Sequence, residues 1–218
     1  MTQTIFIYLI LIVFPIMVFA ADPSTPKLVD FDEKDPKYEL ISVNDLPLSY
    51  RQLTIDEINK QKKVGYTNWP VQNKINLSQI RRNFNDVRRV EKNASFKLGS
   101  LTEYLKLHPL GALGTDMVDR EFTKVTQAYQ LHDKSILLFS ETDLVNTPTY
   151  TTHIKETINA NINEQKGTFT LFRDAGEDYI ASLMWKSGKR INKLVIAGES
   201  VGFETKKLLV TIAKHAIN

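Results

Sequence analysis

The sequence predicts an α+β protein: an antiparallel β-meander sheet with a C-terminal helix on one face, preceded by a small helical region. Three observations support this class. The second half of the chain alternates apolar and polar residues in short runs. Tight turns separate these runs and therefore join antiparallel neighbours, because a parallel pair needs a crossover of about a dozen residues. The final segment, about 203–216, has the apolar spacing of a helix that covers a sheet.

The first twenty residues predict export. Residues 5–19 contain no charged side chain, and the first charged residue is Asp22. This stretch fits the apolar region of a secretory signal and is shorter than the roughly 20 residues that cross a bilayer. We expect cleavage near Ala20 and a periplasmic or secreted product. Because residues 1–4 lack Lys and Arg, an alternative stays open, in which residues 5–19 remain as an anchor in the inner membrane.

The composition excludes several kinds of chemistry. The chain has no cysteine, so it forms no disulfide, thiolate metal site or thiol nucleophile. The four histidines are scattered without metal-ligand spacing, so we expect no metal and no cofactor. The net charge is only +3, which is no argument for nucleic acid as a partner. An exported domain of this kind must be stabilised by its hydrophobic core.

Residues 21–40 contain three prolines and mixed charges, which favours a flexible tether. Residues 41–109 are expected to be mainly helical. Capping-box patterns at 54–57 and 100–103 predict two helix starts. Apolar residues at helical spacing predict a third, continuous helix from Leu77 to about Glu91. Gly and Pro in 109–114 mark the boundary to an α+β domain at 110–218.

Within the second half we expect a sheet of five or six antiparallel strands. Its strands are predicted at 125–131, 135–140, 157–163, 168–173, 179–186 and 190–197. Tyr179, Leu183 and Trp185 share one face of their strand because side chains alternate with a period of two. We therefore expect Trp185 to be buried beneath the terminal helix.

A G-x-S-x-G pattern surrounds Ser200, between a predicted strand and a predicted helix, as in a nucleophile elbow. One hypothesis is therefore a serine hydrolase centred on Ser200. Two observations oppose it. The later acid and base, Glu204 and His215, would stand about 16 Å apart along one helix, and the elbow belongs to a mostly parallel sheet. We expect no catalytic residue here and interpret the pattern as a turn that caps the helix.

Four arginines are the strongest candidate for a binding surface. Arg81, Arg82, Arg88 and Arg89 form two pairs seven residues apart, and on a continuous helix they would share one basic face. Arginine forks suit phosphate and carboxylate groups. We therefore expect docking to an anionic envelope component or to an acidic envelope protein. The alternative is a solvated face whose arginine stems cover apolar surface.

The leading functional hypothesis is thus an exported, non-catalytic binding or accessory protein of the periplasm or cell envelope. A hydrolase centred on Ser200 is one alternative. Another is a membrane-tethered subunit of an envelope assembly, associated with the membrane through residues 5–19.

Overall fold

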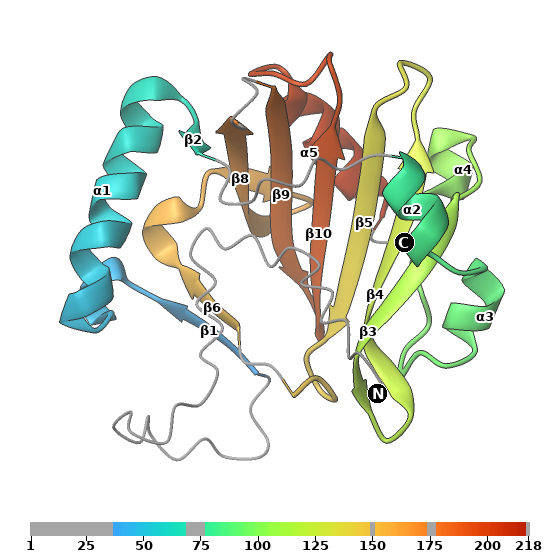
Figure 1. Cartoon of the computed structure of the whole chain (residues 1–218). Coiled ribbons are helices and arrows are strands. Elements are labelled where there is room, and N and C mark those ends of the chain that lie inside the picture. Colours follow the sequence, from blue (N-terminus) through green and yellow to red (C-terminus); the bar gives the residue numbers. More distant parts are fainter. Residues whose placement is uncertain (1–36, 69–76, 149–150, 174–177, 217–218) are drawn as a thin grey trace, which may run out of the picture.

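A mostly antiparallel sheet of eight strands carries the helix α5 and several small helices, so the predicted α+β class is confirmed (Figure 1). The computed structural model describes residues 37–68, 77–148, 151–173 and 178–216. The predicted signal segment and most of the predicted tether lie outside these residues. Within the described ranges, no helix has the length and apolar character needed to span a membrane.

The strands of the main sheet follow the order β2-β8-β9-β10-β5-β4-β3, and β7 pairs with β8. Only the short pair β2–β8 is parallel in this sheet, while β1 and β6 form a separate parallel pair. The strands are β1 Tyr38–Ile41, β2 Thr67–Asn68, β3 Gly111–Val118, β4 Glu121–Gln130, β5 Ile136–Asp143, β6 Thr151–Ile154, β7 Ala160–Ile162, β8 Gln165–Arg173, β9 Tyr179–Ser187 and β10 Arg190–Ala197. The helices are α1 Leu48–Val64, α2 Leu77–Asn83, α3 Val87–Glu91, α4 Thr102–Leu105 and α5 Thr205–His215, with 3-10 turns η1 Val43–Asp45 and η2 Lys155–Thr157.

The predicted strands at 190–197 and 179–186 match β10 and β9 closely, but β3 was missed. We interpreted its glycines as a boundary, whereas they allow close packing within the sheet. A Cβ atom at Gly114 would lie 2.3 Å from the ring of Phe122, and one at Gly111 would lie 3.0 Å from the carbonyl oxygen of Asn85. Strand β1 likewise begins inside the predicted tether. The predicted strand at 157–163 is reduced to β7, which follows the turn η2.

The main hydrophobic core lies between the sheet and α5 (Figure 1). Leu209 and Ile212 of α5 are fully buried against side chains of β9 and β10, including Trp185 and Leu194. The side chain of Trp185 is only 1% exposed. Its predicted position beneath the terminal helix is therefore confirmed.

Two predicted helix starts differ from the structure. Helix α1 begins at Leu48, so Thr54 lies inside it, and its hydroxyl donates to the carbonyl of Tyr50 (2.9 Å) instead of capping the helix. The hydroxyl of Ser100 accepts from the amide of Thr102 (3.2 Å), but α4 ends at Leu105. Both starts were predicted from local patterns, which do not show where tertiary packing begins and ends a helix.

The predicted continuous helix over 77–91 is wrong, because the structure has two short helices there, α2 and α3. Asn85 leaves the helical path and exchanges two backbone hydrogen bonds with Ala112 of β3. The carboxylate of Asp86 then accepts the amide of Arg89 (3.2 Å) and starts α3 as a new helix. The edge strand thus offers the backbone partners that the helix would otherwise supply.

The two helices contact opposite faces of the sheet. Ile80 of α2 packs against Ala128, whereas Val90 of α3 packs against Val125. Ala128 and Val125 are three positions apart on β4, so their side chains point to opposite faces. The two arginine pairs therefore do not form the single basic helix face that the sequence predicts.

Candidate functional site

The segment 85–95 forms an arch over the β3–β4 hairpin and is fixed at both ends. At one end, the amide of Asn85 donates to Ala112 (2.7 Å), and the amide of Ala112 donates back to Asn85 (2.9 Å). At the other end, the amide of Phe122 donates to Asn93 (2.6 Å), and the amide of Ser95 donates to Phe122 (3.0 Å). Helix α3 lies between these two attachments and is therefore held against the hairpin, with Val90 packed on Val125.

A pocket of about 290 Å³ lies between this arch and the hairpin. Such a volume is near the lower limit of small-molecule sites, which span roughly 300–1,000 Å³. The lining contains two arginines, two asparagines and no carboxylate. The lining residues are Asn85, Arg89, Val90, Asn93, Gly114, Met117, Arg120 and Phe122.

Both guanidinium groups of this pocket are unpaired within the part of the chain that the structure describes. Arg89 and Arg120 each have neither a side-chain hydrogen bond nor an ion pair there. Asn93 already donates its side-chain amide to the carbonyl of Arg89 (2.9 Å). The pocket therefore presents two positive charges that the fold itself does not neutralise.

Arg120 is one of seven non-glycine residues with a positive φ angle among those described. Val118 pairs with Glu121 across a two-residue turn, in which Asp119 has φ 49° and Arg120 has φ 70°. Two consecutive positive φ angles are typical of a type I′ hairpin, where Gly and Asn are the preferred residues. A residue with a Cβ atom in this region costs about 1–2 kcal/mol. The chain thus carries a strained arginine where glycine fits more easily.

The structure brings only one of the four predicted arginines into this pocket. All four side chains are exposed, but Arg81 and Arg82 lie on α2, and Arg88 does not line the pocket. Arg120, the partner of Arg89 in the pocket, was not predicted. The Asp119-Arg120 turn between two alternating runs is the sequence feature that could have indicated it. The interpretation of the first run as a domain boundary leaves that turn unrecognised.

Ser200 lies in a hydroxyl–carboxylate cluster. Its hydroxyl donates to the carboxylate of Asp133 and lies 3.2 Å from the hydroxyl of Ser135, which also donates to Asp133 (2.9 Å). The hydrogen bond from Ser200 lowers the pKa of Asp133, which makes this carboxylate a weak base. His215, the base proposed from the sequence, instead stacks on Tyr104 with ring centroids 4.0 Å apart. These contacts favour a structural role for Ser200, which ties its turn to the β4–β5 connection.

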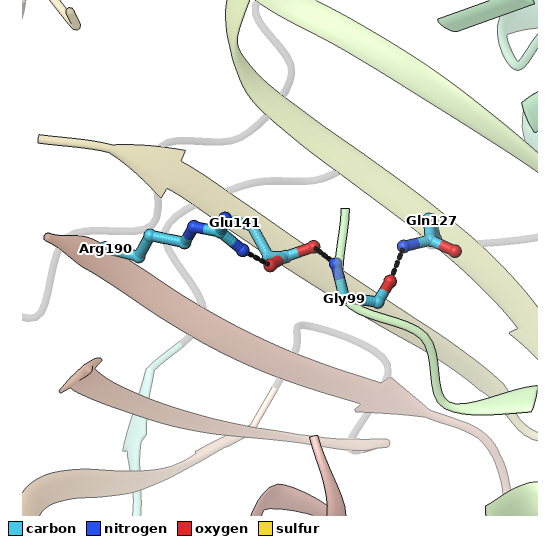
Figure 2. A network of polar contacts seen from close by, with 4 residues as sticks. All are labelled: Gly99, Gln127, Glu141 and Arg190. Atoms are coloured by element: carbon cyan, nitrogen blue, oxygen red, sulfur yellow. Dashed lines mark hydrogen bonds and ion pairs between the residues drawn. The ribbon is translucent and has the colours of Figure 1, made fainter. Parts of the chain in front are cut away.

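A second polar network holds a strap, residues 96–101, on the sheet (Figure 2). Glu141 accepts the amide of Gly99 (2.8 Å) and a guanidinium hydrogen bond from Arg190 (3.0 Å), while Gln127 donates to the carbonyl of Gly99 (2.7 Å). Burial raises the pKa of Glu141, and the amide of Gly99 and the guanidinium of Arg190 partly oppose this. Leu101, the last residue of the strap, is fully buried in the main core. This network is therefore part of the packing of the fold.

His153 joins the β1–β6 pair to the main sheet. Its ring nitrogens lie 2.9 Å from the hydroxyl of Tyr38 and 2.5 Å from that of Thr168. The side chain is 3% exposed, and burial lowers its pKa to about 4. His153 is consequently neutral at neutral pH and acts as a buried hydrogen-bonding bridge.

We expect this histidine to make stability depend on pH. The pKa is about 4 in the folded chain against an ordinary value of 6.5, so the unfolded chain takes up a proton first as the pH falls. Stability is therefore unaffected above pH 6.5 and is lost as the pH falls from 6.5 toward 4, by about 2 kcal/mol at pH 5. Urea unfolding at pH 7.5 and pH 5 measures this loss. His153→Gln should reduce this loss of stability, whereas His132→Gln, at an exposed position, should not. Equal losses in the parent protein and both variants would contradict the role of His153.

The described residues contain no group of three or more His, Asp or Glu side chains that could hold a metal ion. Comparison with models of protein families, with curated proteins and with solved structures finds no match.

Proposed function

We propose that the protein is an exported, non-catalytic binding or accessory protein that docks on an anionic surface of the cell envelope. The arginines of α2 and α3 would carry this contact. The supporting observation is that Arg81, Arg82, Arg88 and Arg89 are all exposed, and that none of their guanidinium groups has a hydrogen bond or ion pair within the described ranges.

These arginines do not serve the fold through ion pairs. Among the described residues, Asp86 accepts the backbone amide of Arg89 instead of pairing with a guanidinium group, and Glu91 forms no ion pair with these arginines. Unpaired charges of one sign repel each other and attract an oppositely charged partner over several ångströms. The two arginine pairs flank the edge strand β3 on opposite faces of the sheet.

Charge reversal tests this docking. Arg82→Glu with Arg88→Glu removes two of the exposed arginines and leaves both arginines of the pocket in place. Each basic residue near an anionic membrane contributes roughly 1 kcal/mol, so binding to phosphatidylglycerol vesicles at low salt should fall at least about tenfold in a sedimentation assay. Binding of the unmodified protein should also weaken as salt increases.

The matched control is Lys166→Glu with Lys207→Glu, which makes the same change of net charge at two other exposed positions. This control should retain most of the vesicle binding. An equal loss in both double variants would show that only net charge matters, and unchanged binding of the arginine variant would remove the proposed surface.

A further inference from the structure

We infer that the pocket between the arch and the β3–β4 hairpin is a binding site for a single phosphate group, held by Arg89 and Arg120. The group belongs either to a small phosphorylated molecule or to a phospholipid headgroup. This inference rests on the proposed function, because it specifies what part of an anionic partner the arginines recognise. It adds a discrete site to a surface that would otherwise attract anions without selectivity.

The charge of the pocket matches phosphate. Two arginines line it from different elements, Arg89 from α3 and Arg120 from the hairpin turn, and the lining contains no carboxylate. A phosphate monoester carries roughly −1.5 to −2 charges at neutral pH and three acceptor oxygens. Arginine forks bind such oxygens with charge-assisted hydrogen bonds. A carboxylate carries one charge, so it would neutralise only one of the two arginines.

The other residues that line the pocket indicate the chemistry of the rest of the ligand. The side-chain amide of Asn85 has no hydrogen bond within the described ranges and supplies a further donor. Val90, Met117 and Phe122 form an apolar part of the same pocket, and Met117 is 60% exposed at the hairpin. The pocket therefore suits a phosphate group attached to a small, partly apolar body.

The strain at Arg120 supports a role outside the fold. Glycine would relieve the backbone, and the guanidinium group forms no hydrogen bond or ion pair within the described residues to compensate for the strain. Six other non-glycine residues among those described also have positive φ angles, including Glu164 (φ 71°), and Arg120 differs from all of them in lining the pocket. Arg120 is therefore placed as a ligand-binding residue.

This strain provides a sharp test with Arg120→Gly in the full chain. The variant removes one cation and relieves the turn, so the melting temperature should stay the same or rise while phosphate affinity falls about tenfold or more. Affinity is measured by calorimetric titration with inorganic phosphate and with glycerol 3-phosphate. Arg89→Gln should also weaken binding. Arg82→Glu with Arg88→Glu, which leaves the pocket residues intact, should change the affinity much less.

The outcomes separate the ligand sources and the two proposals. Saturable binding of the free phosphates that Arg120→Gly weakens assigns the site to a soluble phosphorylated molecule. Binding of phosphatidic acid vesicles, whose phosphate is a monoester, but not of phosphatidylcholine vesicles, again weakened by Arg120→Gly, assigns it to a lipid headgroup. Failure of every probe, or equal binding by Arg120→Gly and the parent protein, overturns the phosphate site. If the phosphate site is overturned but vesicle binding still depends on Arg82 and Arg88, the proposed function stands. If vesicle and phosphate binding depend on Arg120 but not on Arg82 and Arg88, the phosphate site stands without the broader docking surface.

Discussion

Replacing Trp185 with alanine is expected to lower the free energy of unfolding by about 3–5 kcal/mol. The indole is only 1% exposed and packs in the same core as Leu209 and Ile212 of α5. Its removal leaves a large cavity that the surrounding strands fill only in part. For a chain of this size, the melting temperature should fall by about 10 °C. Urea unfolding followed by circular dichroism measures the change.

Trp185→Phe is the matched control. The indole Nε1 is buried without a hydrogen-bond partner among the described residues, so phenylalanine gives up no hydrogen bond and keeps much of the aromatic volume. We expect its effect to be well below that of alanine, about 1–2 kcal/mol. Similar destabilisation by alanine and phenylalanine would contradict a role that rests on buried volume.

Glu141→Ala is expected to destabilise the protein by about 3 kcal/mol, the second large effect. The change removes the acceptor for the amide of Gly99 and the partner of Arg190 (Figure 2). A buried amide without an acceptor and a partly buried charge without its partner are both unfavourable. The strap should detach more readily, so tryptic cleavage after Lys97 should accelerate along with the loss of stability in urea.

Glu141→Gln separates the hydrogen bond from the charge. The side-chain oxygen of glutamine can still accept the amide of Gly99, and burial already raises the pKa of Glu141 and so favours an uncharged group there. We expect a loss of about 1 kcal/mol and nearly unchanged cleavage at Lys97. If Glu141→Ala were cleaved no faster than the parent protein, the network would not be what holds the strap.

Only one of the two arginines of the candidate pocket could be predicted from the sequence. Arg89 belongs to a conspicuous arginine pair, so composition alone pointed to it. Arg120 stands alone in the sequence, and its importance depends on a turn with two positive φ angles and on an arch that closes over the hairpin. The turn is local but lacks the Gly and Asn residues that are typical of a type I′ hairpin, and the arch requires contacts between segments far apart in the chain.

By itself, the sequence determined the features that depend on local periodicity. The alternation in β9 and β10, the tight turn between them, the spacing of α5 and the burial of Trp185 all follow from which face of one element is apolar. Only the tertiary structure decided where the arginines lie. Asn85 pairs with Ala112, which ends α2, and the capping carboxylate of Asp86 starts α3 on the other side of the edge strand. Backbone groups must find partners, and a distant strand can compete successfully with the next turn of a helix.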